Sequence, residues 1–284
     1  ANYGPVLAKN HVILLRNAVS VIKLTQNPRT VLYWLGLSMA TFISFILAKK
    51  AIAVSAYAKK LLTFGLPERI TNKCSVVHHG VDYENSEENS NNIRGEDLLA
   101  VSDIYVQKNY DTLIKAIALL VKRRPKIRLV IIGQAIDLHY LKKLEYLIIK
   151  LNVKDNIVFK GYVKNQEIIS YYRNCRAFIF PSHIETFGNS LLEAMASGAA
   201  IACSRTAAMP EIIGEAGLFY DPNNEHDMAN KIELLLDNDE LRRDLGDLAF
   251  KRASNFHWGK TAQETINVLS EAAQLKSTVQ KRPL

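Results

Sequence analysis

Two glutamates separated by seven residues are the side chains of this sequence best suited to chemistry. Glu185 lies in the polar stretch 181–188, and Glu193 lies in an apolar run rich in helix formers. An apolar run at 177–180 predicts a buried strand before them, so we expect a strand, a loop and a helix start. Such a junction directs backbone N–H groups and the positive end of a helix at one point, and Gly188 lets a ligand approach closely, which suits a phosphate. The two carboxylates suit hydrogen bonds from sugar hydroxyls.

The same residues also have a purely structural interpretation. Ser190 precedes Glu193 by three residues, which is the spacing of a capping box, so Glu193 could serve only to close the helix terminus. Glu185 follows Ser182 at the same spacing and could simply be solvated in a polar loop. The spacing alone leaves both interpretations open.

The elements around these glutamates must position them. From residue 98 onward, short apolar runs alternate with segments of helical length and period, such as 110–123 and 138–151. This alternation predicts an α/β domain with a parallel sheet covered on both faces, in which ligands bind at the carboxyl ends of the strands. The strands are expected at 98–101, 128–132, 157–159, 177–180, 200–203 and 218–220.

Composition narrows the class of protein. The 284 residues are 48% hydrophobic and 23% charged, which is typical of a globular chain, with room for one to two domains of about 150 residues each. The formal net charge of +8 indicates an anionic partner such as nucleotide phosphates or a membrane surface, and no motif for nucleic acid accompanies it. Three dispersed cysteines without metal-ligand spacing indicate a reducing cytosol.

The segment 30–48 contains no charged residue over nineteen positions, close to the ~20 that a membrane span needs. We consider a buried helix of an N-terminal domain, an interfacial helix whose following Lys49 and Lys50 meet anionic headgroups, and a true span. The buried helix is favoured by a partial stripe of small or polar residues that suits packing against protein. This stripe comprises Gly36, Ser38, Thr41, Ser44 and Ala48.

Other features of the N-terminal part are less specific. Residues 10–24 begin with an apolar run that could be a strand or a helix start, because periodicity cannot separate the two at this length. Gly80 follows a strand candidate, and we expect it to act as a hinge with a backbone angle that other residues resist. The two histidines before Gly80 point in different directions and have no third ligand nearby, so no metal site is predicted.

The spacing Glu185-Thr-Phe-Gly-Asn-Ser-Leu-Leu-Glu193 resembles the donor-site signature of the retaining glycosyltransferases of family 4, which have the GT-B fold. The resemblance implies that Glu185 lies beside the transferred sugar and that Glu193 holds the ribose hydroxyls. It also implies that intervening backbone amides contact the pyrophosphate of the donor. These amides belong to Phe187, Gly188, Asn189 and Ser190.

A second segment, Gln107-Lys108-Asn109-Tyr110, resembles the part of that family in which an arginine and a lysine grip the donor diphosphate. Lys108 matches the lysine, which would stabilise the charge on the leaving nucleotide, and its alternative is a solvated surface lysine. The family glycine and arginine are replaced by Ser102 and Asp103. Because an aspartate facing a pyrophosphate would repel it, either Asp103 turns away or the donor site is weaker than in the family.

Two further segments extend the resemblance. Phe159-Lys160-Gly161-Tyr162-Val163 resembles a turn that lies against the nucleotide base, so Tyr162 and Val163 are candidates for the base pocket, with ordinary strand-end packing as the alternative. Phe256-His257-Trp258 resembles the closing segment whose helix crosses back to the N-terminal domain.

The resemblance implies a GT-B arrangement in which a C-terminal Rossmann-like domain is joined to a partial N-terminal one. We expect residues 1–82 to be the last portion of the acceptor-side domain, the polar 83–97 a linker, 98–257 the nucleotide-sugar donor domain, and 258–284 the crossing helix and tail. The N-terminal glycine-rich loop and histidine of the family have no counterpart here. We therefore expect an N-terminally truncated chain, whose own activity is open.

The implied function is transfer of a hexose from a nucleoside diphosphate sugar, UDP-linked or alternatively GDP-linked, to a glycan or lipid-linked acceptor in polysaccharide biosynthesis. The resemblance implies retention at the anomeric carbon without a metal or other cofactor, with Glu185 and Lys108 as catalytic residues. The expected location is the cytoplasm, with peripheral contact at the inner membrane face through residues 30–50 as an alternative. A GT-B phosphorylase or epimerase, a non-catalytic nucleotide-sugar-binding fragment, and a basic membrane-surface protein remain rival interpretations.

Overall fold

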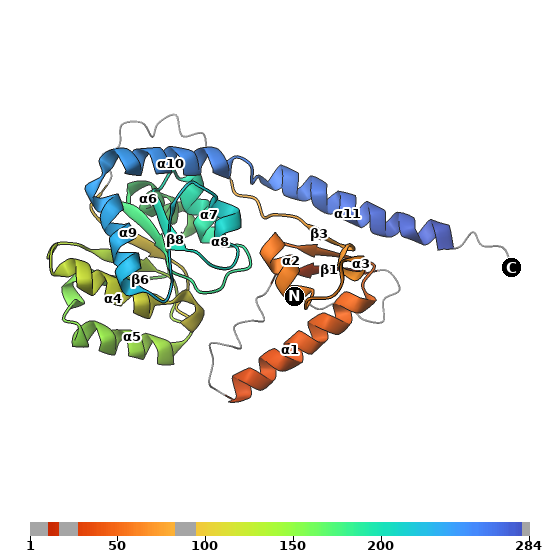
Figure 1. The fold of residues 1–284 in the computed structure, drawn as a ribbon, viewed down its shortest axis with the longest axis horizontal. Coiled ribbons are helices and arrows are strands. Elements are labelled where there is room, and N and C mark those ends of the chain that lie inside the picture. The colour runs from red at the N-terminus through yellow and green to blue at the C-terminus, as the bar shows by residue number, and fades with distance from the viewer. Residues whose placement is uncertain (1–10, 17–27, 83–94, 280–284) are drawn as a thin grey trace. The chain divides into compact units, whose positions relative to one another are not determined.

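The computed structural model describes residues 11–16, 28–82 and 95–279 of the chain. Contacts divide the chain into two compact units (Figure 1). The first unit comprises Ala1–Gly80, Ile184–Phe187 and Phe256–Leu284, and the second comprises Val81–His183 and Gly188–Asn255.

The second unit is built on a six-stranded parallel sheet with the order β6-β5-β4-β7-β8-β9. Its strands confirm all six sequence predictions with small shifts at their ends. Every residue of β4, β5, β7 and β8 is buried, as expected for parallel strands covered on both faces. The strands are β4 Leu98–Val101, β5 Leu129–Ile132, β6 Ile157–Gly161, β7 Ala177–Phe180, β8 Ile201–Ser204 and β9 Leu218–Tyr220.

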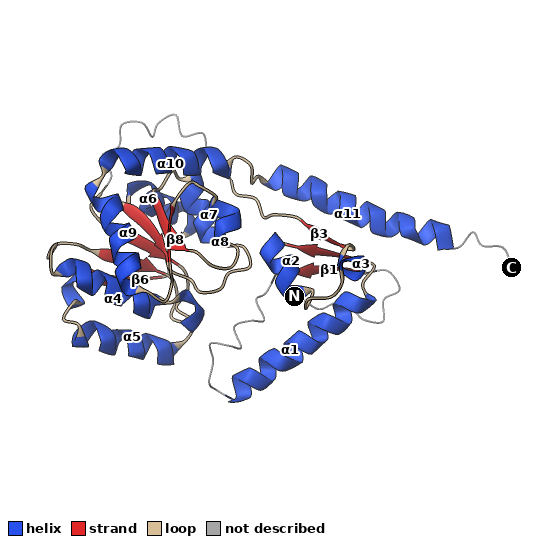
Figure 2. Cartoon of the chain, viewed as in Figure 1, coloured by secondary structure: helices blue, strands red, loops and turns tan. Residues whose placement is uncertain are grey.

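Helices cover this sheet on both faces (Figure 2). One face packs its buried side chains against α4, α5 and α9 in a single apolar cluster. On the other face, Phe178 of β7 packs edge-on against Tyr172 of α6, with 5.4 Å between the ring centroids. The helices are α4 Tyr110–Val121, α5 Leu138–Lys150, α6 Asn165–Asn174, α7 Asn189–Ala196, α8 Met209–Ile213, α9 Glu225–Asp237 and α10 Asp239–Ala253.

The strand order contains a switch point. From β4 the chain proceeds through β5 to β6 at one edge, and it then returns to β7 on the other side of β4 and proceeds to β9. In open parallel sheets, ligands bind in the crevice outside the carboxyl ends of the strands at such a reversal. The topology therefore directs attention to the loops that follow β4 and β7.

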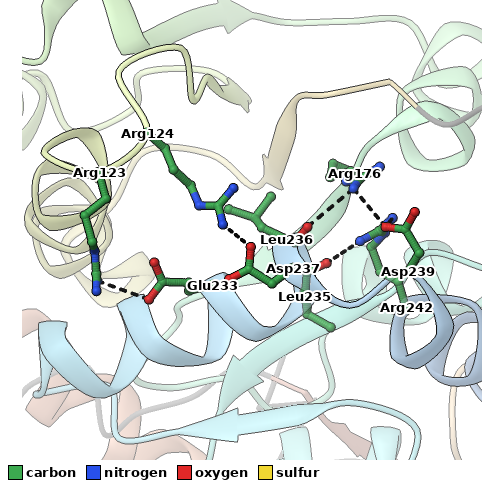
Figure 3. A network of polar contacts seen from close by, with 9 residues as sticks. All are labelled: Arg123, Arg124, Arg176, Glu233, Leu235, Leu236, Asp237, Asp239 and Arg242. Atoms are coloured by element: carbon green, nitrogen blue, oxygen red, sulfur yellow. Dashed lines mark hydrogen bonds and ion pairs between the residues drawn. The ribbon is translucent and has the colours of Figure 1, made fainter.

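A network of polar contacts lies at the amino ends of the strands, opposite the carboxyl ends at which the switch point directs ligands (Figure 3). Arg176, directly before β7, donates to Leu236 O at 3.4 Å and to Asp239 Oδ1 at 3.0 Å. The buried Arg242 of α10 donates to Leu235 O at 2.6 Å and also to Asp239. Arg123 and Arg124, which follow α4, form ion pairs with Glu233 and Asp237 of α9. These contacts join α4, α9, α10 and β7 away from the candidate site.

The first unit contains a three-stranded parallel sheet with the order β1-β2-β3. The ambiguous run at 10–24 forms a strand over Val12–Leu15, and residues 17–24 lie outside the described part of the chain. Val268 of the C-terminal helix packs against Ile52 of β2 and against Val77, which directly follows β3. The elements are β1 Val12–Leu15, α1 Pro28–Leu47, β2 Lys50–Ala53, α2 Ala56–Leu62, α3 Glu68–Thr71, β3 Cys74–Val76 and α11 Trp258–Val279.

Helix α1 has an inverted distribution of polarity. The stripe noted in the sequence faces inward over the second half of the helix, where Thr41 and Ser44 are buried, and Ala48 directly after the helix is buried as well. Large apolar side chains cover the outward face instead, so the favoured expectation of a buried helix is wrong for that face. No helix in the described ranges is long and apolar enough to cross a bilayer. The exposed side chains are Leu32, Tyr33, Leu35, Met39, Phe42, Ile43, Ile46 and Leu47.

Gly80 is required for a different reason from the one expected. Its φ lies outside the left-handed region, so the backbone angle is open to other residues. A Cβ at this position would instead lie 2.3 Å from the backbone nitrogen of Trp258. The glycine therefore permits two backbone segments of the first unit to touch.

Candidate functional site at the carboxyl ends of β4 and β7

Asn109 organises the loop that follows β4. It is buried and left-handed, with φ of 57°, between the 3₁₀ turn Val106–Lys108 and the start of α4. Asparagine tolerates this conformation better than most residues. Its Nδ2 donates to Pro181 O at 3.1 Å and to Pro222 O at 2.8 Å, directly beyond β7 and β9. One side chain thus ties three loops together at the carboxyl edge.

Lys108 is held between two such attachments. On its other side, Gln107 O accepts a hydrogen bond from the backbone N–H of His183 at 2.9 Å. Because both neighbours of Lys108 bind the segment that follows β7, the backbone of Lys108 is fixed at the switch point. The backbone of this lysine therefore lies at the carboxyl edge of the sheet, and its role toward a diphosphate stays a prediction.

Asp103 is turned toward the loop that follows β5. Its Oδ1 accepts a hydrogen bond from the backbone N–H of Gln134 at 2.8 Å. The two loops also touch at Gly133, where a Cβ would lie 2.0 Å from Ser102 O. This carboxylate therefore helps to join the two loops, and the choice between an Asp103 that turns away from the pyrophosphate and a weaker donor site stays open.

The start of α7 supplies backbone donors. Gly188 is the N-cap residue, with φ of 95°, and the helix begins at Asn189. The cap has no side chain to occupy the first-turn N–H groups, and the helix dipole favours an anion there. The expected positions of Gly188, Asn189 and Ser190 at a helix N-terminus are therefore met in the second unit, together with Lys108.

Glu193 lies one turn further along α7 and does not form a capping box with Ser190. Its Oε2 accepts a hydrogen bond from the hydroxyl of Tyr172 on α6 at 2.9 Å. Burial raises the pKa of Glu193 from its ordinary value, and the hydrogen bond from Tyr172 lowers it. Burial also raises the pKa of Tyr172 well above its ordinary value, and Glu193 adds to the effect, so this hydroxyl stays protonated and donates.

The segment that contains Glu185 belongs to the first unit. Thr186 O accepts from the hydroxyl of Ser55, the N-cap of α2, and the Thr186 hydroxyl donates to Arg16 O. The ring of Phe187 is 2% exposed, and its centroid lies 4.9 Å from that of His79. Glu185 and Phe187 therefore belong to the first unit, whereas Lys108 and Glu193 belong to the second.

Tyr162 and Val163 directly follow β6 at the same carboxyl edge of the sheet. β5 separates β6 from β4, so these residues lie farther along the edge than Lys108. Tyr162 is 67% exposed, which does not fit the alternative of strand-end packing for its side chain. The backbone is fixed beside them, since Gly161 O accepts from Gly133 N at 3.0 Å.

Comparison with known families identifies the chain. The model of the family "Glycosyl transferases group 1" matches residues 82–252. The chain belongs to this family. The match spans the whole sheet of the second unit and includes Lys108, Gly188 and Glu193.

Curated relatives are longer than the part matched here. A glycosyltransferase of Methanocaldococcus jannaschii is 30% identical over 224 residues, which are 78% of this chain and 59% of that protein. The O-antigen chain mannosyltransferase B of Escherichia coli is 34% identical over 111 residues, 39% of this chain and 29% of that protein. The group 1 chain thus spans less than two thirds of the length of these relatives.

Solved structures of similar fold support the architecture. The Anabaena protein HepE, in complex with UDP and glucose, matches with a TM-score of 0.77 and 20% identity over 92% of this chain and 71% of that one. The sucrose-phosphate synthase of Thermosynechococcus elongatus matches with a TM-score of 0.72 and 19% identity over 94% and 67%. These likenesses confirm the predicted α/β fold of GT-B type, with two Rossmann-like parallel sheets.

Proposed function

We propose that this group 1 chain binds a nucleoside diphosphate sugar and transfers its hexose, with retention, to a glycan or lipid-linked acceptor. The observation that carries the proposal is the attachment of both neighbours of Lys108 to the loop that follows β7. The backbone of Lys108 thereby lies beside the switch point of the sheet, and α7, whose N-cap Gly188 makes no side-chain cap hydrogen bond, begins after the same loop. A diphosphate is the ligand that such a combination of lysine and backbone N–H groups suits.

The proposed roles follow from this placement. Lys108 and the backbone amides of Gly188, Asn189 and Ser190 would take the charge that develops on the departing diphosphate, which requires no metal. Glu193 would hold the ribose hydroxyls, Tyr162 and Val163 would contact the base, and Glu185 would act beside the transferred sugar. In this proposal 98–257 is the donor domain, 1–82 belongs to the acceptor side, 83–97 links the two, and 258–284 crosses back.

Names of relatives favour polysaccharide assembly as the setting. Besides the Escherichia coli O-antigen chain mannosyltransferase, a Campylobacter jejuni relative, 29% identical over 204 residues, is named for transfer of N-acetylgalactosamine onto a diphospho-undecaprenol-linked sugar. We propose an acceptor of the same chemistry for this protein, which would act at the cytoplasmic side of a membrane. UDP-linked and GDP-linked hexoses are the donors to test.

Binding and transfer measurements separate the two glutamates. We expect Glu193→Ala to weaken UDP or GDP binding about tenfold or more, because a charged hydrogen bond to the ribose is lost. We expect Glu185→Ala to lower transfer with little change in nucleotide affinity. Titration calorimetry with both nucleotides checks the first expectation, and unchanged affinity in the Glu193 variant would reject the proposed donor site.

Product analysis addresses the rival activities of a GT-B enzyme. A phosphorylase would release sugar phosphate, an epimerase would release an altered nucleotide sugar, and a transferase lengthens the acceptor. A non-catalytic fragment would bind nucleotide and form none of these products. Chromatography of reactions that contain a panel of nucleotide sugars, an acceptor glycan and inorganic phosphate distinguishes the four.

We also propose that the outward face of α1 rests on an anionic lipid surface, where a lipid-linked acceptor would be available. The face carries eight exposed large apolar side chains from Leu32 to Leu47, and the helix itself contains no acidic residue. Residues 28–80 together hold seven Lys or Arg and a single Glu, and of these cations Lys50 is paired with Glu271 of α11 at 2.6 Å. Apolar area combined with positive charge is the pattern of an interfacial helix.

Vesicle sedimentation tests this surface. We expect the chain to sediment with phosphatidylglycerol vesicles but not with phosphatidylcholine vesicles, and the double change Leu35→Asp and Met39→Asp to abolish it. Ile149→Asp is the matched control, because Ile149 is also an exposed apolar residue on a helix, but in the second unit. Vesicle binding that survives the double change, or a dimer in solution that the double change dissociates, would assign the face to something other than lipid.

A further inference from the structure

Tyr172 is a buried polar residue that the family resemblance did not assign to the site. Its side chain is 1% exposed, although it carries a hydroxyl. The ring packs against Phe178 of the central strand β7, with centroids 5.4 Å apart, so its position is set by the sheet. The hydroxyl reaches across from α6 to α7 and meets Oε2 of Glu193 at 2.9 Å.

The hydrogen bond from Tyr172 counteracts the effect of burial on the charge of Glu193. Burial raises the pKa of this carboxyl group, so burial opposes the charged form that binds a hydroxyl most strongly. A donor on one carboxylate oxygen offsets part of that penalty and selects one orientation of the side chain. The second oxygen then has a defined direction.

We propose that Tyr172 is a positioning residue of the donor site, whose hydroxyl holds Oε2 of Glu193 so that Oε1 accepts a hydrogen bond from a ribose hydroxyl of the nucleotide. The inference rests on the proposed function, in which Glu193 binds the ribose. It adds a residue from a different helix, twenty-one positions earlier in the chain. The preference of the site for a ribonucleotide then depends on the hydrogen bond from Tyr172 to Glu193, although Tyr172 itself does not contact the nucleotide.

The test measures the ratio between the affinities for a ribonucleotide and for its deoxy form. A Tyr172 that only supports the fold would leave this ratio unchanged. The probes are UDP and GDP and their 2′-deoxy and 3′-deoxy forms, measured by calorimetry with the 284-residue chain. In the unaltered protein we expect one deoxy form to bind about tenfold more weakly than the parent nucleotide, because one charged hydrogen bond is missing. In Tyr172→Phe this ratio should fall toward one, while the affinity for that deoxy form stays the same.

Matched variants isolate the hydroxyl. Tyr172→Phe keeps the ring that packs on Phe178 and removes only the donor. Tyr171→Phe is the control on the same helix, since Tyr171 lines a separate hollow with Gly95 and Leu98 at the amino end of β4. The control should keep the full preference for the ribonucleotide. A Tyr172→Phe change added to Glu193→Ala should have no further effect on the ratio, because the group that it positions is already gone.

The outcomes separate this inference from the proposed function. If Glu193→Ala leaves nucleotide affinity unchanged, the proposed donor site fails. If Glu193→Ala abolishes the ribose preference but Tyr172→Phe retains it, the donor site stands and the positioning role of Tyr172 is wrong. Equal weakening of parent and deoxy nucleotides in Tyr172→Phe also overturns it, since the hydroxyl would then support the fold rather than the ribose contact.

Discussion

At the scale of single residues, Glu193 shows a conflict between binding and stability. Burial raises its pKa in the folded chain above the ordinary value of 4.5, so the folded state binds this proton more tightly than the unfolded state does. As pH rises, the unfolded chain therefore releases this proton before the folded chain does. The stability of the folded state falls between pH 4.5 and the higher pKa of Glu193 in the folded chain. The charged form needed for binding is thus maintained at a cost to folding.

This conflict predicts that Glu193→Gln raises the stability of the chain at neutral pH. The amide keeps an oxygen that accepts from Tyr172 and removes the buried charge. We expect the gain in free energy of unfolding to be larger at about pH 7.5 than at about pH 4, where the native carboxyl group is largely protonated. Urea unfolding at both pH values measures it, and a gain that is the same at both would contradict the assigned direction of the shift.

At the level of residues, the sequence supplies candidates for the site but not the contacts that support them. Lys108, Gly188 and Glu193 are candidates because short segments at strand ends resemble those of a known family. The partners of Asp103 and Glu193 could not be found this way, since Gln134 and Tyr172 approach only after the sheet and its covering helices have formed. Asn109 did carry a signal, namely an asparagine between a strand and a helix, which is a residue type that tolerates a left-handed backbone.

At the scale of elements, Asn109 joins the loops of three strands, and its removal should affect them together. Asn109→Asp replaces two donated hydrogen bonds with a buried carboxylate that faces two carbonyl oxygens. We expect a loss of about 2–4 kcal/mol in stability and weaker nucleotide binding, because Lys108 and the segment after β7 lose their common attachment.

Asn152→Asp is the control for this change. Asn152 is also left-handed, with φ of 55°, but it is exposed at the end of α5. Its substitution should alter stability by less than about 0.5 kcal/mol. Similar losses in both variants, measured by urea unfolding, would show that backbone conformation rather than the two side-chain hydrogen bonds matters at Asn109.

Elements differ in how well the sequence predicts them. The strands of the second unit were predicted because buried parallel strands are short continuous apolar runs bounded by polar residues. Helix α1 was predicted as a helix, but not its orientation. Its inward side carries Thr41 and Ser44, and its outward side is apolar, which reverses the usual pattern from which burial is inferred.

At the scale of the whole molecule, the division of residues into the two compact units does not follow their order in the chain. Ile184–Phe187 belong to the first unit although the residues on both sides of them belong to the second. A segment of four residues carries no composition signal that could reveal such an assignment, whereas a change of unit after Gly80 lies close to the polar stretch that begins at residue 83. The sequence therefore predicts the sheets better than it predicts the grouping of the loop that holds Glu185.

The amino edge of the second unit provides a test of global stability that leaves the site untouched. Arg242 is 7% exposed, donates to Leu235 O at 2.6 Å and pairs with Asp239, so it links α9 to the start of α10. Arg242→Met keeps much of the volume but leaves the carbonyl without this donor, and we expect a loss of about 2–3 kcal/mol.

The adjacent Arg243 is exposed, and Arg243→Met should cost less than about 0.5 kcal/mol. Because the network lies at the amino ends of the strands, both variants should bind UDP or GDP as the unaltered chain does at temperatures below their unfolding transitions. Thermal unfolding combined with calorimetry checks this. A folded Arg242→Met variant with weakened nucleotide binding would show that the two edges of the sheet are energetically coupled, contrary to the separation that the structure indicates.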